Sequence, residues 1–257
     1  CVFMDNHSPQ PLSLFLTGTY PCSYLPEQQA RSQAVAQADY VDSQVYSQLM
    51  RYGFRRSGLY TYRPQCDQCK ACVSVRIVVD EFTPNRTQRR LFKKHQQALY
   101  AYCLPDLSWH DEHYELYQRY QASRHPDNSE QTGPDEYIEF MLSSHVDTQL
   151  VEFRSEDNVL RMVSVFDILD DGLSAVYTFY DVDYIGSLGS YAIMWLNELC
   201  KRFGRPYLYL GYWVENSQKM NYKMNYQPLE YYFKGSWSRQ KPSNLVNKVA
   251  PTVSEHV

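Results

Sequence analysis

Four cysteines in the first third of the chain have the residue type and spacing that point most directly to chemistry. Three form the pattern Cys66-x-x-Cys69-x-x-Cys72, and Cys22 lies upstream. Two residues between thiolates allow one turn to present both sulfurs to a single ion, at about 2.3 Å for zinc. We therefore expect Cys22, Cys66, Cys69 and Cys72 to hold a structural zinc ion or an iron–sulfur cluster, with reduced thiols in a turn as the alternative.

Positive charge is concentrated in one stretch of an otherwise acidic chain. Residues 51–95 contain eleven Lys and Arg against three acids, a net charge of +8, whereas the whole chain carries −4. A negative net charge argues against general coating of nucleic acid. A local basic surface still suits a phosphate backbone, and a solvated helix face is the alternative.

The composition is that of a folded protein outside the membrane. Of 257 residues 44% are hydrophobic and 24 are tyrosine, which excludes a disordered chain. The longest apolar runs are far shorter than a membrane span. No basic residue precedes the apolar residues 12–16, so we expect no signal peptide and a cytoplasmic protein. Cys103 and Cys200 lie among apolar residues, which predicts core positions.

The spacing of apolar residues and turn formers predicts helices and strands in an α+β order. In the first part we expect a helix at 40–50, strands at 54–62 and 73–79, and a basic helix at 86–100 capped by Thr83 or Asn85. In the second part we expect helices at 112–123 and 134–143, strands at 149–154, 159–169 and 173–180, a helix after Gly189, a strand at 206–213, a polar helix-like stretch to Met224 and a strand at 229–233.

This order predicts two domains and a tail. Antiparallel strands followed by a Gly-rich loop, a helix, a strand, a helix and a strand fit a GNAT-like (N-acyltransferase) layout better than a doubly wound sheet. We expect an N-terminal domain with the cysteines and the basic stretch at 12–95, a GNAT-like catalytic domain at 96–238 and a flexible tail at 239–257.

Several strings together resemble the bacterial branch of the arginyl-tRNA–protein transferase family. They are PCSYLP at 21–26, GFRRSG at 53–58, YRP at 62–64 with the cysteine pattern and Arg76, SAVYTFYDVD at 174–183, YLGYW at 209–213 and KMNYK at 219–223. They run in the family's order over about residues 18–235. One departure is that arginyl members pair their cysteines as CxxC upstream and as adjacent cysteines downstream, whereas Leu25 leaves Cys22 alone here.

The resemblance implies an aminoacyl-tRNA–protein transferase whose catalytic centre lies in a GNAT-like domain. The short length and the PCSYLP string imply transfer of leucine from leucyl-tRNA to proteins with N-terminal Asp or Glu, which marks them for degradation through the N-degron pathway. Arginine as the donated residue is the alternative, and a metal-stabilised RNA-binding module without catalysis is the second. Because an ester becomes an amide, the chemistry requires no cofactor, and the partners are leucyl-tRNA and acidic protein N-termini, with no membrane.

The implied reaction assigns roles to residues in the matching strings. Candidate catalytic residues, which accept a proton, orient the amine or stabilise the oxyanion, are Tyr180, Asp181, Asp183, Tyr222 and Lys223. For Asp181 and Asp183 a role in a hairpin turn is the alternative. Candidate substrate-binding residues are Arg56, Arg76, Tyr209, Tyr212 and Trp213. Selecting an acidic residue needs a cation, for which we expect Arg56 or Arg76, with Lys223 as the rival. Candidate contacts to the acceptor-stem phosphates are Arg86, Arg89, Arg90, Lys93 and Lys94.

Overall fold

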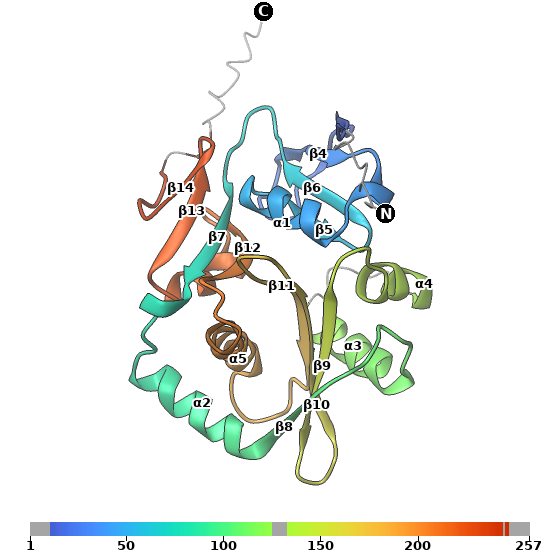
Figure 1. The fold of residues 1–257 in the computed structure, drawn as a ribbon, viewed down its shortest axis with the longest axis vertical. Coiled ribbons are helices and arrows are strands. Elements are labelled where there is room, and N and C mark those ends of the chain that lie inside the picture. Colours follow the sequence, from blue (N-terminus) through green and yellow to red (C-terminus); the bar gives the residue numbers. More distant parts are fainter. Residues whose placement is uncertain (1–10, 125–132, 244, 247–257) are drawn as a thin grey trace, which may run out of the picture.

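The computed structural model describes residues 11–124, 133–243 and 245–246, and its largest element is a mixed sheet in the order β14-β13-β7-β12-β11-β10-β9-β8 (Figure 1). The strands are β7 Cys72–Val78, β8 Leu99–Cys103, β9 Thr148–Ser155, β10 Leu160–Ile168, β11 Gly172–Tyr180, β12 Tyr207–Val214, β13 Leu229–Phe233 and β14 Ser236–Ser238. Helices and strands thus combine in the mixed α/β manner that the sequence predicts.

A smaller sheet, in the order β1-β4-β6-β5, lies beside the large one (Figure 1). Its strands are β1 Leu14–Leu16, β4 Ser32–Val35, β5 Arg55–Ser57 and β6 Tyr60–Pro64, and a separate ribbon pairs β2 Tyr20–Pro21 with β3 Gln29–Ala30. The helices are α1 Ser43–Arg51, α2 Arg86–Ala98, α3 Asp111–Arg124, α4 Pro134–Tyr137 and α5 Leu188–Arg202, with a π-helical turn at Ile138–Leu142 and 3₁₀ segments at Ala38–Tyr40, Val79–Glu81 and Gln218–Asn225.

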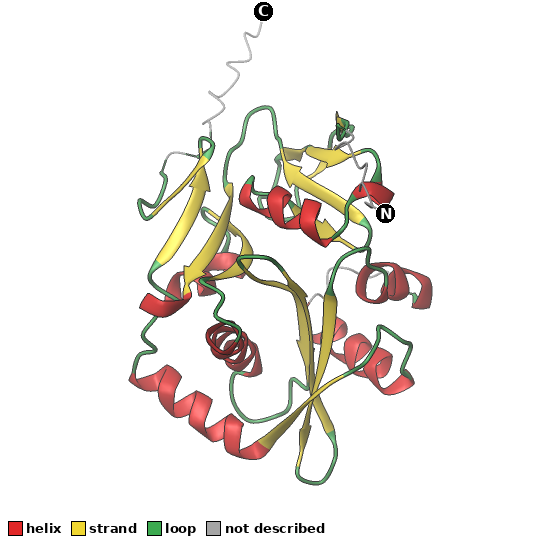
Figure 2. Cartoon of the chain, in the orientation of Figure 1, coloured by secondary structure: helices red, strands yellow, loops and turns green. Residues whose placement is uncertain are grey.

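Helices cover both faces of the large sheet (Figure 2). Side chains of a strand alternate between the faces, so Val151 and Phe153 pack in the cluster that contains α5, whereas Leu150 packs in the cluster that contains α3. Helix α2 lies against α5. The core is therefore two apolar layers separated by one sheet.

Strand β7 comes from the predicted N-terminal domain but pairs within the large sheet. It is antiparallel to β12 on one side and to β13 on the other. One sheet therefore contains strands from both predicted domains, whose boundaries stay a prediction. Of the predicted tail, residues 244 and 247–257 lie outside the described residues.

Helix α2 confirms the basic helix and its cap. The Asn85 side chain accepts a hydrogen bond from the Gln88 backbone N–H, and the Gln88 side chain accepts one from Asn85. The helix ends at Ala98 rather than at residue 100, because Leu99 already pairs with Ser155 as the start of β8.

Strand β8, which the sequence did not predict, is an edge strand of the large sheet. Its residues alternate poorly, since most of the strand is exposed. Cys103 is exposed at its end, so the prediction of a core position is wrong there, whereas Cys200 is buried as predicted. The polar stretch before residue 225 is a 3₁₀ helix.

The small sheet and α1 are joined to the large sheet by an apolar cluster and a buried ion pair. Tyr46 and Phe54 pack with Tyr209 of β12. The Arg56 guanidinium donates to both carboxylate oxygens of Asp167, at 2.9 and 2.6 Å, and the two side chains are 3% and 0% exposed. Further donors of Arg56 reach Gly58 and Thr148. Arg56 therefore holds the small sheet against β10.

We expect Arg56→Met to lower the free energy of unfolding by about 3–5 kcal/mol, because Asp167 is then a buried charge without a counterion. Urea unfolding at pH 7 measures this. The double variant Arg56→Met/Asp167→Leu should recover most of the loss. As a control, Arg31→Met breaks the exposed pair with Asp67 and should cost less than about 1 kcal/mol. Equal losses in the two single variants would contradict the structural role of Arg56.

Candidate functional site

The large sheet divides where its parallel pair ends. Strands β11 and β12 are paired only from Gly172 to Ser174, although β11 continues to Tyr180. On β12 the register with β7 shifts between Tyr209 and Gly211, and Gly211 has a φ of +82°, which favours glycine. We call this place the fork and define it by Ser174, Ala175, Gly211 and Tyr212.

The Arg55 side chain lies in the fork. Its Nη1 donates to Ser174 Oγ at 3.0 Å and its Nη2 donates to the Ala175 carbonyl at 2.6 Å. A Cβ added to Gly211 would lie 3.4 Å from Arg55 Nη2, in van der Waals contact with the guanidinium, so Arg55 lies directly against β12. Arg55 therefore bonds to a β11 carbonyl just beyond the last parallel pair.

Lys223 approaches the same place from the 3₁₀ segment. It is 4% exposed, and its Nζ donates to the Tyr212 carbonyl. Burial, followed by the nearby positive charge of Arg55, lowers the pKa of Lys223 to about 7. Within the described part of the chain, neither Arg55 nor Lys223 forms an ion pair with a carboxylate.

Tyrosines surround the two cations. The Tyr212 hydroxyl donates to the Gly53 carbonyl at 3.0 Å and is buried. Tyr222 is 47% exposed, and Lys223 Nζ lies 5.7 Å from its ring centroid. Tyr180 is half-buried, and Arg124 Nη2 donates to its hydroxyl at 3.4 Å. Tyr212, Tyr222 and Lys223 of the predicted site thus lie around the fork. Tyr180 lies at the other end of β11, near enough to Tyr222 to raise the pKa of Tyr222.

The two predicted aspartates follow β11 and differ in their surroundings. The Asp181 carboxylate accepts hydrogen bonds from Arg161 Nη1 at 2.7 Å and from the Asp183 backbone N–H at 3.1 Å. Asp183 is exposed. These contacts suit the alternative of a turn, and Asp181 carries an ion pair of its own.

Arg76 has carboxylate partners inside the protein, as Arg56 does. Its Nη2 lies 2.7 Å from Glu230 Oε2, and its guanidinium stacks over the Tyr207 ring at 3.5 Å. Arg76 Nη1 also donates to the Tyr209 hydroxyl at 2.9 Å, and Tyr209 is fully buried. Binding of a substrate carboxylate by Arg56 or Arg76 would require breaking these ion pairs.

Trp213 lies in the core. It is 2% exposed, and its ring contacts Tyr231 edge-on, with centroids 6.1 Å apart. The sequence analysis therefore named one residue of β12 at the fork, Tyr212, and two, Tyr209 and Trp213, that are held in internal contacts.

Sequence reasoning missed Arg55. Adjacent residues of a strand point to opposite sides, so Arg55 and Arg56 have different surroundings. The sequence alone could not distinguish them, because their partners Ser174 and Asp167 lie more than 110 residues away. The repeated arginine at the start of a short strand was the available signal.

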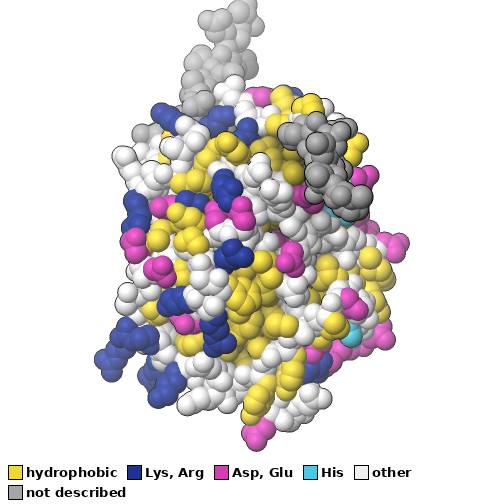
Figure 3. Space-filling view, viewed as in Figure 1, with side chains coloured by type: hydrophobic (Ala, Val, Ile, Leu, Met, Phe, Trp, Pro, Cys, Tyr) yellow, Lys and Arg dark blue, Asp and Glu magenta, His cyan; other side chains and the backbone are white. Residues whose placement is uncertain are grey.

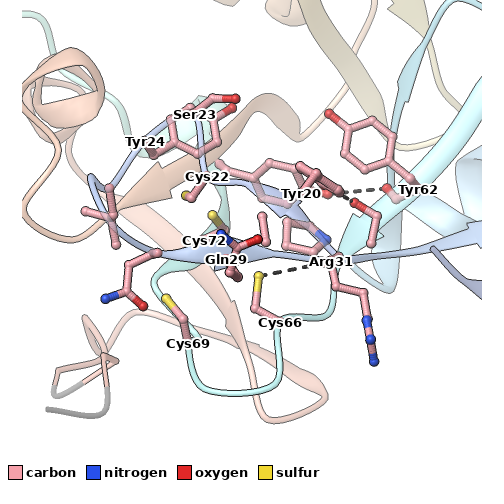
Figure 4. Close-up of a pocket in the computed structure, with 16 residues that line it drawn as sticks. Tyr20, Cys22, Ser23, Tyr24, Gln29, Arg31, Tyr62, Cys66, Cys69 and Cys72 are labelled. Carbon is pink, nitrogen blue, oxygen red and sulfur yellow. Dashed lines mark hydrogen bonds between the residues drawn. The ribbon is translucent and has the colours of Figure 1, made fainter. Parts of the chain in front are cut away.

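The four predicted cysteine ligands line one pocket (Figure 4). The cavity has a volume of about 130 Å³ and is also lined by tyrosines, among them Tyr24, Tyr62 and Tyr212. Burial, and then the neighbouring cysteines, raises the pKa of Cys72 to about 12. Burial also raises the pKa of Cys69. These thiols are therefore protonated at neutral pH as they are arranged here.

A metal ligand must be a thiolate, and the ligands must converge on one point. Among the described His, Cys, Asp and Glu side chains, no three are grouped closely enough to hold a metal ion. The donor chemistry of the four cysteines suits zinc or an iron–sulfur cluster, but their arrangement does not. Metal ligation by Cys22, Cys66, Cys69 and Cys72 stays a prediction.

The predicted tRNA contacts lie on the exposed side of α2. Gln88 and His95 face the protein. The exposed residues are Arg86, Arg89, Arg90, Lys93 and Lys94, and none of them forms an ion pair with a described residue. Positive side chains gather in the region of α2 at the lower left of Figure 3. Charge of this kind on a surface helix is suited to contacts with phosphates.

No described helix combines the length and the apolar character needed to cross a lipid bilayer.

Solved structures resemble part of the chain. The structure of L-PGS from Bacillus licheniformis has a TM-score of 0.48 and 13% sequence identity, covering 64% of this chain and 60% of that one.

Curated proteins match much more closely. A protein of Thiobacillus denitrificans named aspartate/glutamate leucyltransferase is 51% identical over 230 residues, covering 89% of this chain and 95% of its own length. Proteins with the same name are 47% identical in Polynucleobacter asymbioticus, over 88% of this chain and 93% of theirs, and 50% identical in Chromobacterium violaceum, over 88% and 93%.

Two family profiles cover most of the chain. The profile described as "Arginine-tRNA-protein transferase, N terminus" matches residues 20–90, and the one described as "Arginine-tRNA-protein transferase, C terminus" matches residues 112–233. The four cysteines of the pocket and Arg55 lie in the first match, and the strand β11, the fork's Gly211 and Lys223 lie in the second. The chain therefore belongs to the arginine-tRNA–protein transferase family.

Proposed function

We propose that this protein transfers leucine from leucyl-tRNA to proteins whose N-terminal residue is Asp or Glu, which creates a signal for degradation. The observation that carries the proposal is that relatives 47–51% identical over nearly their whole length are named aspartate/glutamate leucyltransferase. Such a reaction takes place in the cytoplasm, where leucyl-tRNA is available.

In this reaction the α-amine of the acceptor attacks the ester carbonyl of leucyl-tRNA. A C–N bond forms, the bond from the carbonyl carbon to the ribose oxygen breaks, and a proton passes from the amine to the ribose hydroxyl. The α-amine has a pKa of about 7.7–8.0, so part of it is already neutral near pH 7. The protein has to align amine and ester, move one proton and stabilise the oxyanion.

Lys223 is our candidate for the proton transfer. A base works best when its pKa lies near the working pH, and burial brings the pKa of Lys223 to about 7. Our candidates for hydrogen bonds to the oxyanion are Tyr222, which is exposed beside Lys223, and Tyr180, which is half-buried and lies near Tyr222. The Tyr212 hydroxyl already donates to the Gly53 carbonyl. We therefore assign Tyr212 to lining the site and not to binding the oxyanion.

The exposed face of α2 is our candidate surface for the tRNA acceptor stem. Its five cations have no carboxylate partner among the described residues, so their charge is available to phosphates.

The first expected outcome concerns the reaction itself. Incubation with labelled leucyl-tRNA should transfer leucine to peptides that start with Asp or Glu, and not to peptides that start with Arg or Ala. The measurement is the label retained on the peptide. Arginyl-tRNA serves as the competing donor. Transfer of arginine instead of leucine, or transfer to Arg-starting peptides alone, would contradict the proposal.

The second concerns tRNA binding. Arg89→Ala/Lys93→Ala should lower the slope of log Kd against log salt by about 1.4–1.8, because each residue contributes about one phosphate contact at 0.7–0.9 per contact. A binding titration across salt concentrations measures the slope. The control Lys201→Ala/Arg202→Ala removes two exposed cations from the end of α5 and should leave it unchanged. A slope equal to that of the parent protein would mean that this face of α2 does not contact tRNA.

The third concerns the pKa of Lys223. At pH 7 the variant Lys223→Met should unfold with a larger free energy than the parent, because it buries no amine. Between pH 7 and about 10.4 the unfolded parent binds more protons than the folded parent, so the parent gains stability as pH rises. The advantage of the variant should therefore shrink with pH, by up to about 1.4 kcal/mol per unit.

Urea unfolding of both proteins from pH 7 to 9.5 measures this difference. The buried thiols and tyrosines are present in both proteins, so their contributions to the pH dependence of the free energy of unfolding cancel. The control Lys219→Met changes an exposed lysine of the same segment and should give a difference that is constant with pH. A constant difference for Lys223→Met would show that its pKa is not lowered.

A further inference from the structure

Arg55 differs from the other buried arginines in its partners. Arg55, Arg56 and Arg76 are 7–8% exposed. Arg56 pairs with Asp167 and Arg76 pairs with Glu230, whereas Arg55 bonds only to a hydroxyl and a carbonyl of the described residues. A buried cation without a counterion is unfavourable. The Arg55 guanidinium therefore lacks a counterion among the described residues and is free to pair with an anionic group of a substrate.

The surroundings of Arg55 favour an anion further. Lys223 is near enough that Arg55 lowers its pKa, so the two basic groups repel each other when both are charged. The other titratable groups that interact with Arg55 are neutral tyrosines. They come from α1, the small sheet, β12, the 3₁₀ segment and the cysteine pocket and are, in that order, Tyr46, Tyr62, Tyr212, Tyr222 and Tyr24. A bound carboxylate would relieve the repulsion.

The guanidinium also has free hydrogen-bonding capacity. Arginine has five N–H donors, of which the bonds to Ser174 and Ala175 use two. These bonds fix the plane of the group at the end of the parallel ladder. A fixed guanidinium with donors to spare is suited to binding a carboxylate through two parallel hydrogen bonds.

The substrates of the proposed reaction offer few anions. The leucyl group and the acceptor N-terminus each carry an amine, which a guanidinium repels. Close to the reacting amine and ester, the anionic groups are the phosphates of the tRNA 3′ end and the side-chain carboxylate of the acceptor's first residue. The exposed cations of α2 already suit phosphates, whereas a side chain of Asp or Glu is small enough for a site that is 8% exposed.

We propose that Arg55 binds the side-chain carboxylate of the acceptor's N-terminal Asp or Glu and so determines acceptor specificity. This inference rests on the proposed function. It assigns the role that the sequence suggested for Arg56 or Arg76 to the neighbouring arginine. Ser174 is then a positioning residue that orients Arg55.

The test compares acceptor peptides that start with Asp and with Asn, which differ in charge but hardly in shape. The assay uses the whole 257-residue chain. One series varies the peptide at saturating leucyl-tRNA, and a second series varies leucyl-tRNA at a fixed peptide concentration to give its KM. Arg55→Gln should lower kcat/KM for the Asp peptide by about 30-fold or more, as expected for removal of one partner of a buried charge pair. For the Asn peptide it should lower kcat/KM by a much smaller factor, which reflects the lost effect of Arg55 on the pKa of Lys223, and it should leave the KM for leucyl-tRNA nearly unchanged. The Asp-over-Asn preference should therefore collapse.

Two further variants keep the test decisive if Arg55→Gln folds poorly in a thermal melt. Arg55→Lys keeps the charge but loses the paired donors, so it should retain part of the Asp-over-Asn preference. Ser174→Ala should reduce that preference by a smaller factor with little change in melting temperature. The matched control Arg63→Gln removes a guanidinium that bonds Gln33 and Tyr52 in the same small sheet, and should keep the preference.

Three results would overturn the inference. An unchanged Asp-over-Asn ratio in Arg55→Gln, with equal losses for both peptides, would make Arg55 a structural residue. An unchanged ratio with a raised KM for leucyl-tRNA would make it a phosphate contact. An unchanged ratio in folded Arg55→Lys and Ser174→Ala would exclude it as the specificity residue. Failure of the proposed function is distinguishable, because the parent protein would then transfer leucine to neither peptide.

Discussion

The end of the parallel ladder between β11 and β12 is the constraint on which the rest of the site depends. Beyond Ser174 the strands separate, and the Ala175 carbonyl no longer has a strand partner on that side. An unpaired buried carbonyl is unfavourable, and Arg55 supplies the missing donor. Because Arg55 belongs to the small sheet, the large sheet can divide at this point only while the small sheet is held against it.

Two neighbouring residues of one short strand perform different tasks as a result. Arg56 points to Asp167 and fixes β5 on β10, while Arg55 points into the fork. The ion pair of Arg56 fixes the backbone of β5, and this also fixes the position of the adjacent Arg55. The Arg55 guanidinium still has N–H donors that are not used within the protein. Lys223 belongs to the 3₁₀ segment, far along the chain from β5, and its Nζ donates a hydrogen bond to the Tyr212 carbonyl. The site is therefore assembled from segments that are distant in sequence.

Local features of the chain were predictable and long-range ones were not. The cap at Asn85, the strands on either side of the turn at 170–172 and the face of α2 follow from patterns within a few residues, and the structure has them. Strand β8 was missed because an exposed edge strand has no apolar alternation. The cysteine spacing predicted a metal site, and the four cysteines do line one pocket. Whether their sulfurs converge on one point depends on how segments distant in sequence pack, which the spacing does not show. The ion pairs of Arg56 with Asp167 and of Arg76 with Glu230 were not predictable from the sequence, because the partners are more than 110 residues away.

The place of β7 has a consequence for how the chain acquires its structure during synthesis. This strand leaves the ribosome long before β12 and β13, the two strands that flank it, and its pairs with them join residues more than 120 positions apart. Its apolar residues Val73, Val75 and Ile77 are fully buried in the finished sheet. The nascent chain must therefore carry an unpaired apolar strand until β12 and β13 have been synthesised, and contacts so distant in sequence form slowly. We therefore expect newly made chains of this protein to need protection by a chaperone until β13 has been synthesised.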